Sequence, residues 1–388
     1  MNVLIKKEHD DLRKKIREFA ESKVKPVILD FDKNEEFPVM LINGLGKLGV
    51  FGMHAPVEYG GSGADTLSYI IAVEELARVD GSVGATLAAH NSLGVGPIVE
   101  FGTEEQKQKY LPGLCTGEEL WAFGLTEKNA GSDAQGIETI AELTGGQWKI
   151  NGSKLFITNG SAVISKGLTV AAITGKRNDG RKEISAILVE NSTEGVNAHT
   201  MKGKLMWRAA NNADMTFTDV HVPYENLLGG RGEGIHIMLK TIDNGRLSIA
   251  ALGLGCAQGA FEMATGYAVK RKQFGRSISE FQGVSFKLAD MAMKIENARN
   301  TLYNACWLKD NGFDFCKQSA IAKLYCSEIA REVADEAIQI FGGIGLLHEN
   351  HIERFYRDQR LLQIGEGTSE ILRIVISRRI LKEFEEHS

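Results

Sequence analysis

The chain contains only six prolines, and after the last of them, Pro223, 165 residues follow without another. Proline removes a backbone donor and breaks helix interiors, so a long stretch without it can form long helices. Apolar residues recur there at three- and four-residue spacing, and glycine-containing turns separate the periodic runs, which cover residues 235–271, 281–311 and 313–341. These segments predict a helix bundle.

The first 115 residues also have a helical pattern. Leu12, Ile16 and Phe19 form one apolar stripe, and residues 103–106, Thr-Glu-Glu-Gln, form a capping box that starts another helix.

The middle of the chain predicts strands instead. Short β-rich runs, separated by glycine and asparagine turns, cover residues 148–151, 184–189 and 215–222. The expected order is therefore helical, β, helical. We predict an N-terminal helical domain, a middle β-domain and a C-terminal helical domain at residues 1–118, 119–230 and 231–388.

Charge and hydropathy exclude several classes of protein. The formal net charge is −5 and the last six residues, 383–388, are acidic, which argues against a nucleic-acid partner. No apolar run approaches the ~20 residues that span a bilayer, so no membrane partner is expected. The N-terminus lacks the apolar core of a signal peptide, and the five cysteines form no Cys-x-x-Cys pair. Both features predict a cytoplasmic protein with reduced thiols.

Known cofactor-binding motifs are missing. The nearest metal spacing, His348 and His351, has no third ligand nearby in sequence, so we expect no metal. No Gly-x-Gly-x-x-Gly follows a predicted strand, because residues 253–255, Gly-Leu-Gly, lie inside a helical pattern. A nucleotide-type cofactor would therefore need another mode of binding.

Near the C-terminus a lone carboxylate, Glu366, lies between Gly365 and Gly367. Thr368 follows as the predicted N-cap of an amphipathic helix. Such a carboxylate can serve as a catalytic base beneath a bound ligand. It can equally be a solvated side chain in a glycine-rich turn, and this motif taken alone leaves both readings open.

Further segments carry a resemblance. The segments that match, in order, are 123–133, 155–160, 271–275, 339–343 and 364–371. Together they resemble the acyl-CoA dehydrogenase family of the short-chain or branched-chain type, from about residue 5 to residue 383. The resemblance implies an α+β fold in which a small β-domain lies between a helical domain and a C-terminal four-helix bundle. It also implies FAD as cofactor and conversion of an acyl-CoA to the 2-enoyl-CoA.

The family's flavin contacts can be carried over residue by residue. The resemblance implies that Phe123, Thr126 and Ser132 line the flavin ring and its ribityl chain. Phe156 would pack on the ring, although as part of a strand it could instead be a core residue, and Thr158 would bind near flavin N5. The other cofactor contacts implied are Thr368, Glu370, Arg271, Gln273, Phe274, Gln339 and Gly343.

Of these residues, five would reach the FAD of a neighbouring subunit: Arg271, Gln273, Phe274, Gln339 and Gly343. An oligomer, expected to be a homotetramer, follows from that implication. The expected electron acceptor is an electron-transfer flavoprotein.

The resemblance makes Glu366 the base that removes the α-proton while flavin N5 accepts the β-hydride. Some relatives carry the base at the position of Gly245, which cannot take a proton. The substrate contacts implied are Ser132, Asp243, Arg246, Gly365 and Glu366, although Asp243 and Arg246 could instead form an ordinary surface pair. We expect Glu366 to be an ordinary acid until bound substrate buries it and raises its pKa.

Two departures from the family pattern concern specificity. Gly365 replaces a common tyrosine, which favours a branched or cyclic acyl group over a straight short chain such as butyryl. Residues 207–212, Trp-Arg-Ala-Ala-Asn-Asn, replace the usual Arg-x-Ser-Asp-Thr, and the sequence gives no functional reason for that change. An acyl-CoA oxidase is a further alternative, and a DNA-associated flavoprotein is disfavoured.

Overall fold

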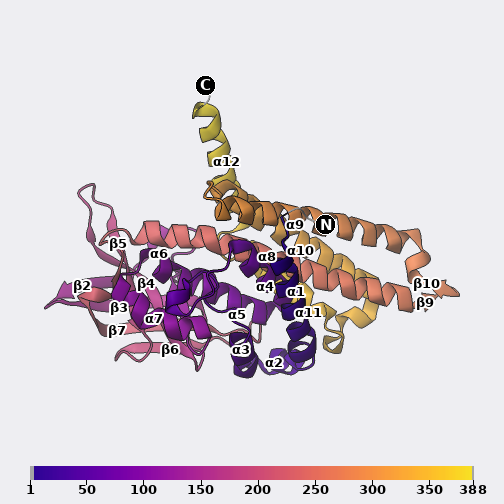
Figure 1. Ribbon diagram of the computed structural model, residues 1–388, viewed down its shortest axis with the longest axis horizontal. Helices are drawn as coiled ribbons and strands as arrows, with labels where there is room; N and C mark the ends of the chain where they lie inside the picture. Colours follow the sequence, from indigo (N-terminus) through magenta and orange to yellow (C-terminus); the bar gives the residue numbers. More distant parts are fainter. Residues whose placement is uncertain (1–3, 387–388) are drawn as a thin grey trace.

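The structure, a computed structural model, describes residues 4–386 (Figure 1). The expected helical, β, helical order is confirmed. From residue 4 onward, seven α-helices precede the first strand: α1 Lys7–Phe19, α2 Ile28–Asn34, α3 Val39–Gly46, α4 Thr66–Ala77, α5 Gly81–Ala89, α6 Gly96–Phe101 and α7 Glu104–Thr116. The capping box at the start of α7 forms as predicted, since Gln106 N–H donates to Thr103 Oγ1 at 3.2 Å.

The strands of the middle region form one sheet in the order β6-β7-β3-β2-β4-β5-β8, and β1 pairs with β4 in parallel. The strand-like runs of the sequence lie in β3, β5 and β7, so these predictions are confirmed. The strands are β1 Leu120–Gly124, β2 Ile140–Thr144, β3 Gln147–Thr158, β4 Ser165–Lys176, β5 Lys182–Glu190, β6 Val196–Thr200, β7 Asn212–Pro223 and β8 Leu227–Leu228.

The C-terminal region is helical, and the three predicted helices are α8 Gly234–Lys270, α9 Gln282–Asp310 and α10 Cys316–Phe341. The short α11 Ile352–Asp358 and the terminal α12 Ser369–Glu386 follow. Gly253 lies where α8 passes close to α10, because an added Cβ would be 2.8 Å from the Cys326 carbonyl oxygen. The Gly-Leu-Gly run therefore serves helix packing. The domain boundaries near 118 and 230 stay a prediction.

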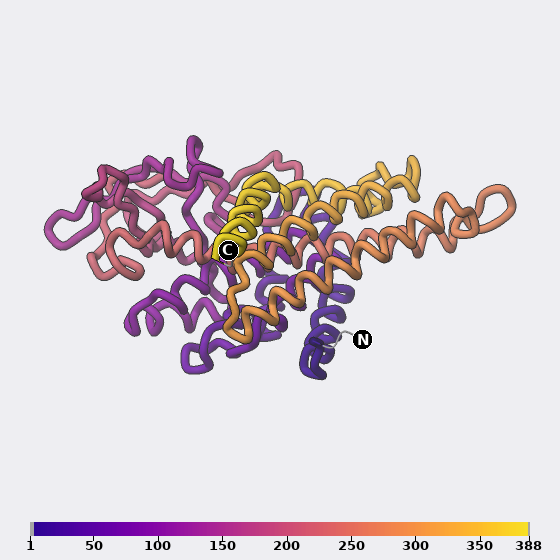
Figure 2. Tube along the Cα trace, turned by 90° about the horizontal axis from the view of Figure 1, so that it is seen from above, coloured from indigo at the N-terminus to yellow at the C-terminus, as the bar shows by residue number. Residues whose placement is uncertain are grey.

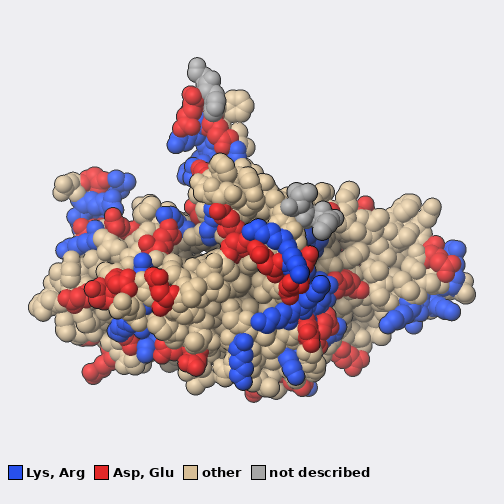
Figure 3. Space-filling view, in the orientation of Figure 1, with Lys and Arg blue, Asp and Glu red and all other residues tan. Residues whose placement is uncertain are grey.

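Figures 1 and 2 show an elongated molecule. The sheet lies at one end, and the far ends of α8 and α9, joined through β9 Lys272–Gln273 and β10 Arg276–Ser277, form a tip at the other. Helix α12 stands away from the body and exposes apolar side chains, among them Leu381 and Phe384. On the face seen in Figure 3, acidic and basic side chains are interspersed.

Helix α8 is the one helix within residues 4–386 whose length and composition would allow it to cross a membrane. Its most apolar window has a mean hydropathy of 1.3, and 78% of that window is buried inside the protein. Such burial is typical of the central helix of a protein core, and it explains the apolar character of α8 without a membrane.

Candidate active site

Glu366 lies in the turn that precedes α12. Its φ angle is 53° and that of Gly367 is 100°, so two successive residues adopt left-handed backbone conformations. Ile371 N–H donates to Thr368 Oγ1 at 3.2 Å, which confirms Thr368 as the N-cap of α12. A non-glycine residue in this conformation is uncommon, and strained residues of this kind cluster at active sites and ligand-binding turns.

The Glu366 carboxylate points against α8. Its Oε2 atom is buried and has no hydrogen-bond partner within residues 4–386. A Cβ added to Gly245 of α8 would overlap this oxygen and would lie 3.0 Å from a methyl carbon of Leu93. Glycine at position 245 therefore makes room for the carboxylate.

Burial raises the pKa of Glu366 to about 7, although the positive charges of Lys323 and Arg246 lower it in part. The expectation that Glu366 is an ordinary acid until substrate binds is therefore wrong. The physical reason is that the protein itself desolvates the carboxylate, and desolvation outweighs the favourable field at a helix N-terminus.

Two cations on neighbouring helices face this turn. Lys323 of α10 is fully buried, and its Nζ donates to the Gly367 carbonyl oxygen at 2.6 Å. Burial lowers the pKa of Lys323 to about 8, against the opposing charge of Glu366. Arg246 of α8 is 6% exposed and forms an ion pair with Asp243. The surface-pair reading of Asp243 and Arg246 is therefore wrong, because the pair is folded into the protein beside Glu366.

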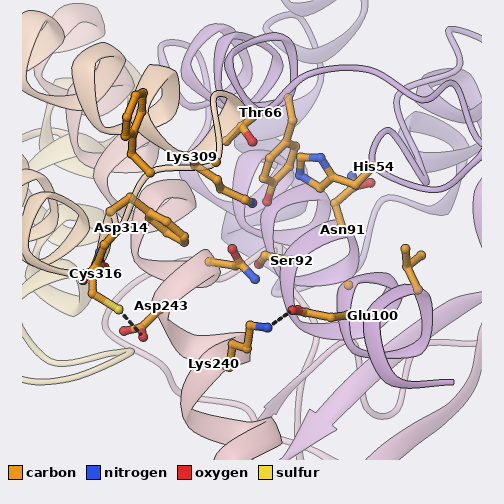
Figure 4. Close-up of a pocket in the computed structure, with 17 residues that line it drawn as sticks. His54, Thr66, Asn91, Ser92, Glu100, Lys240, Asp243, Lys309, Asp314 and Cys316 are labelled. Atoms are coloured by element: carbon orange, nitrogen blue, oxygen red, sulfur yellow. Dashed lines mark hydrogen bonds and ion pairs between the residues drawn. The ribbon is translucent and has the colours of Figure 1, made fainter.

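A cavity of about 610 Å³ opens next to this pair (Figure 4). Its walls come from His54, α4, the segment that joins α5 to α6, α6, α8, the end of α9 and the α9–α10 connection. Asp243 and Asn244 line it directly before Gly245, and Cys316 Sγ donates to Asp243 Oδ2 at 2.9 Å. Lys309 also lines the cavity, and burial lowers its pKa. An elongated ligand in this cavity would lie close to the carboxylate.

The predicted flavin contacts of the middle region lie on two neighbouring segments. Phe123 belongs to β1, and Leu155 N–H donates to the Thr126 carbonyl oxygen at 2.9 Å, which holds the two segments together. Phe156 is 61% exposed, with a φ angle of 61°, at an irregularity in the β3–β7 pairing. The core reading of Phe156 is therefore wrong, since the ring points out of the sheet. Thr158 ends β3 and is half-buried, whereas Ser132 is exposed in a loop.

The remaining predicted cofactor residues lie elsewhere. Thr368 and Glu370 lie at the start of α12, and Glu370 is exposed. Arg271, Gln273 and Phe274 lie at the tip, where Phe274 is 94% exposed. Gln339 and Gly343, both exposed, flank the C-terminal end of α10, and there Tyr267 of α8 stacks on Phe341 of α10 at 4.3 Å between ring centroids. In Figures 1 and 2 the tip lies at the opposite end of the molecule from the sheet. One chain therefore does not bring the tip residues to Thr158.

Comparison with known proteins decides the family. The acyl-CoA dehydrogenase N-terminal, middle and C-terminal domains match residues 6–118, 122–220 and 232–381, respectively. The chain belongs to the acyl-CoA dehydrogenase family. It is an oxidoreductase of the flavoprotein type that acts on acyl-CoA.

Three relatives add detail. Butyryl-CoA dehydrogenase from Megasphaera elsdenii is 42% identical, with a TM-score of 0.94 over 98% of this chain and 100% of that one. The caffeyl-CoA reductase-Etf complex subunit CarC from Acetobacterium woodii is 42% identical over 96% of this chain and 97% of its own. An acyl-CoA dehydrogenase from Bacillus anthracis, solved in complex with FAD, is 33% identical, with a TM-score of 0.92 over 99% of this chain and 68% of that one.

Residues 207–212 of this acyl-CoA dehydrogenase hold the segment around Thr158. Asn211 Oδ1 accepts the Ser161 N–H at 2.9 Å, and Asn212 Nδ2 donates to Thr158 Oγ1 at 2.9 Å. Trp207 has a φ angle of 46°, and its N–H donates to Asp358 Oδ1 at 2.7 Å. The two asparagines thus take over the ordering of a loop from the hydroxyl and carboxylate that the family pattern carries there.

Sequence reasoning about this acyl-CoA dehydrogenase missed Lys323. The available signal was a lysine on the apolar face of a predicted helix, because such a residue needs a partner when it is buried.

The fold also brings Asp32 and Glu353 to His348, so three possible metal ligands meet. Arg357 of this acyl-CoA dehydrogenase already donates to Asp32 at 2.8 Å and to Glu353 at 2.6 Å, so a protein cation neutralises these carboxylates. The absence of a metal stays a prediction.

Proposed function

We propose that this enzyme removes the α- and β-hydrogens of a short-chain acyl-CoA to give the 2-enoyl-CoA, with Glu366 as the base. The observation that carries the proposal is the buried Oε2 of Glu366, which has a pKa of about 7 and no hydrogen-bond partner among residues 4–386. It faces Gly245 of α8, and the two residues before Gly245 line the cavity. A general base works best when its pKa is close to the working pH. At neutral pH about half of the Glu366 side chains would be ionised and ready to accept the α-proton.

The acidity of the α-proton depends on how the thioester carbonyl is held. We propose that the Glu366 backbone N–H, in the turn before α12, donates to the carbonyl oxygen, where negative charge builds as the proton leaves. Lys323 and Arg246 would favour the ionised base, and Lys323 also fixes the Gly367 peptide. Asp243, Arg246 and Ser132 would hold the CoA portion of the substrate.

The middle-region residues fit FAD. An exposed aromatic ring at Phe156 offers a stacking surface, and the Thr158 hydroxyl receives a hydrogen bond from Asn212, which leaves its own hydrogen for a ligand. We propose that Phe123, Thr126 and Ser132 complete this half of the site, with Thr368 and Glu370 across from it. Bound FAD supplies the acceptor for the β-hydrogen, which leaves as hydride.

The far half of FAD requires a second chain. The tip, which carries Arg271, Gln273 and Phe274, lies at the other end of the molecule from the sheet that contains Thr158. The end of α10, with Gln339 and Gly343, packs on α8 near the tip through Phe341 and Tyr267. Exposed Phe274 and the apolar side chains of α12 are surfaces that a neighbouring subunit would cover. We therefore propose a homo-oligomer, expected to be a tetramer in the cytoplasm. Similarity to the Etf-complex subunit supports an electron-transfer flavoprotein as acceptor.

Similarity to butyryl-CoA dehydrogenase favours a straight short chain as the acyl group. Gly365 supports a second candidate, an acyl group branched or cyclic near the thioester. A Cβ added to Gly365 would meet Leu361 only at an ordinary contact distance of 3.7 Å, so the backbone leaves room for substrate beside the base.

The test is anaerobic bleaching of the flavin absorbance by butyryl-CoA and, in parallel, by isobutyryl-CoA. We expect bleaching with butyryl-CoA in the native enzyme, none with Glu366→Gln, and native behaviour with Glu18→Gln, an exposed carboxylate of α1. Faster bleaching by isobutyryl-CoA would select the branched candidate. Equal bleaching of native enzyme and Glu366→Gln would refute Glu366 as the base.

A further inference from the structure

The departure at residues 207–212 places the side-chain amide of Asn212 beside Thr158, where the family pattern has a threonine. Asn212 begins β7 and is the direct cross-strand partner of Thr158, the last residue of β3. It is 6% exposed, and its Nδ2 donates to Thr158 Oγ1 at 2.9 Å. The usual residue here, threonine, carries a hydroxyl that can either donate or accept.

Lys204 fixes the orientation of the Asn212 amide. Its Nζ donates to Asn212 Oδ1 at 2.8 Å and also to the carbonyl oxygens of Trp207 at 2.9 Å and Ala210 at 2.6 Å. A lysine ammonium has three donors and no acceptor, so the amide atom facing it must be the oxygen. The NH2 group therefore faces Thr158, and the amide cannot flip without placing two donors against each other.

The consequence concerns the hydrogen of Thr158. Because the Thr158 hydroxyl oxygen accepts from Asn212, its hydrogen has to point elsewhere, away from β7. We propose that Asn212 is a positioning residue that directs the Thr158 hydroxyl hydrogen toward the flavin edge, with Lys204 holding it in place. This inference rests on the proposed FAD site at Thr158. A fixed donor at that edge stabilises negative charge on the reduced flavin and so favours reduction.

The substitution Asn212→Asp tests this direction with almost no change of shape. The aspartate still accepts from Lys204, but its second oxygen can only accept, so the Thr158 hydrogen turns back toward residue 212. Asn211→Asp is the matched control, because it adds the same charge one residue earlier and its side chain contacts Ser161 instead.

The readout is the two-electron midpoint potential of the bound flavin, measured by reductive titration without substrate. For Asn212→Asp we expect about a tenfold loss in preference for reduced flavin, which corresponds to a potential lower by about 30 mV. A change of less than threefold is expected for Asn211→Asp. In a Thr158→Val background, which has no hydroxyl, Asn212→Asp should add less than threefold.

Equal shifts in the two aspartate variants would overturn the inference, because charge alone would then explain them. An unchanged potential in Asn212→Asp with flavin bound would overturn it too. If Asn212→Asp does not fold, Asn212→Ala takes its place: it leaves the hydroxyl free to rotate and should cost about threefold, and no loss there would again count against the inference. A native protein that cannot bind FAD would instead refute the proposed function.

Discussion

Replacement of Lys323 by methionine should change the pH dependence of catalysis. Lys323 is fully buried, it lowers the pKa of Glu366, and it holds the Gly367 carbonyl oxygen at 2.6 Å. Methionine has similar bulk but neither the charge nor the donor. The pKa of Glu366 in the free enzyme, about 7 with Lys323 present, should therefore rise.

The size of the change follows from the effect of a nearby opposite charge, which lowers the pKa of a carboxyl by about one to three units. We use the lower value, because the hydrogen bond of Lys323 goes to the Gly367 carbonyl oxygen. A base whose pKa moves from about 7 to about 8 falls from about one half ionised at pH 7 to about one tenth. The expected loss in kcat/KM at pH 7 is therefore roughly fivefold, and it should vanish above about pH 9, where both enzymes are fully ionised.

The assay is kcat/KM for butyryl-CoA from pH 5.5 to 9.5 with an artificial electron acceptor, because this profile reports the free enzyme. Lys323→Gln is the matched control, since it keeps an N–H donor for the Gly367 carbonyl oxygen but carries no charge. Both variants should shift the profile to higher pH, and Lys323→Met should lower the high-pH plateau more. If the profiles keep the native pKa while the plateau falls, the electrostatic reasoning is refuted and Lys323 only supports the turn.

Three further predictions concern the same site. The pKa of Glu366 is about 7 in the folded protein and near 4.5 in the unfolded chain, so the free energy of unfolding falls as pH rises between these values. In urea unfolding, Glu366→Gln should be more stable than the native protein at pH 8, by up to ~3 kcal/mol, and equally stable at pH 4. A gain of the same size at both pH values would contradict the pKa assignment. Gly245→Ala should lower kcat/KM by tenfold or more, because the added methyl group would displace the Glu366 carboxylate. Gly266→Ala is the control on the same helix, where open space surrounds the glycine, and it should keep native activity. Equal activities of the two variants would show that the Glu366 carboxylate does not lie against Gly245. Phe156→Ala should reduce flavin content with little change in Tm, since the ring is 61% exposed, and a large drop in Tm at full flavin content would indicate a structural ring instead.

Local patterns were enough to predict much of the fold. Three- and four-residue spacing located α8, α9 and α10 to within a few residues, since each helix places one apolar face on the core. The short alternating runs located β3, β5 and β7 but not the full sheet. The order of its strands depends on contacts between residues far apart in the chain, which no local pattern contains.

The sequence predicted part of the candidate site. The features that depend on neighbouring residues were predicted correctly, and those that depend on distant parts of the chain were not. Sequence placed Glu366 and Thr368 correctly in a turn before a helix, because glycine and N-cap preferences are local. It gave the wrong pKa behaviour for Glu366, since the carboxylate is buried against α8 and α10, whose residues Gly245 and Lys323 precede it by more than 40 residues. For the same reason it left Asp243 and Arg246 undecided.

The turn that carries Glu366 opposes stability in three ways. Glu366 has a left-handed backbone conformation, its Oε2 is buried without a hydrogen-bond partner in the described part of the chain, and buried Lys323 has a pKa of about 8. Each of these features lowers stability when taken alone. Together they favour a ligand that approaches this oxygen, because the backbone conformation aims the carboxylate and the positive charge of Lys323 favours its ionised form. A turn that served only to connect α11 to α12 would need none of them, so their coincidence at one residue argues for catalysis there.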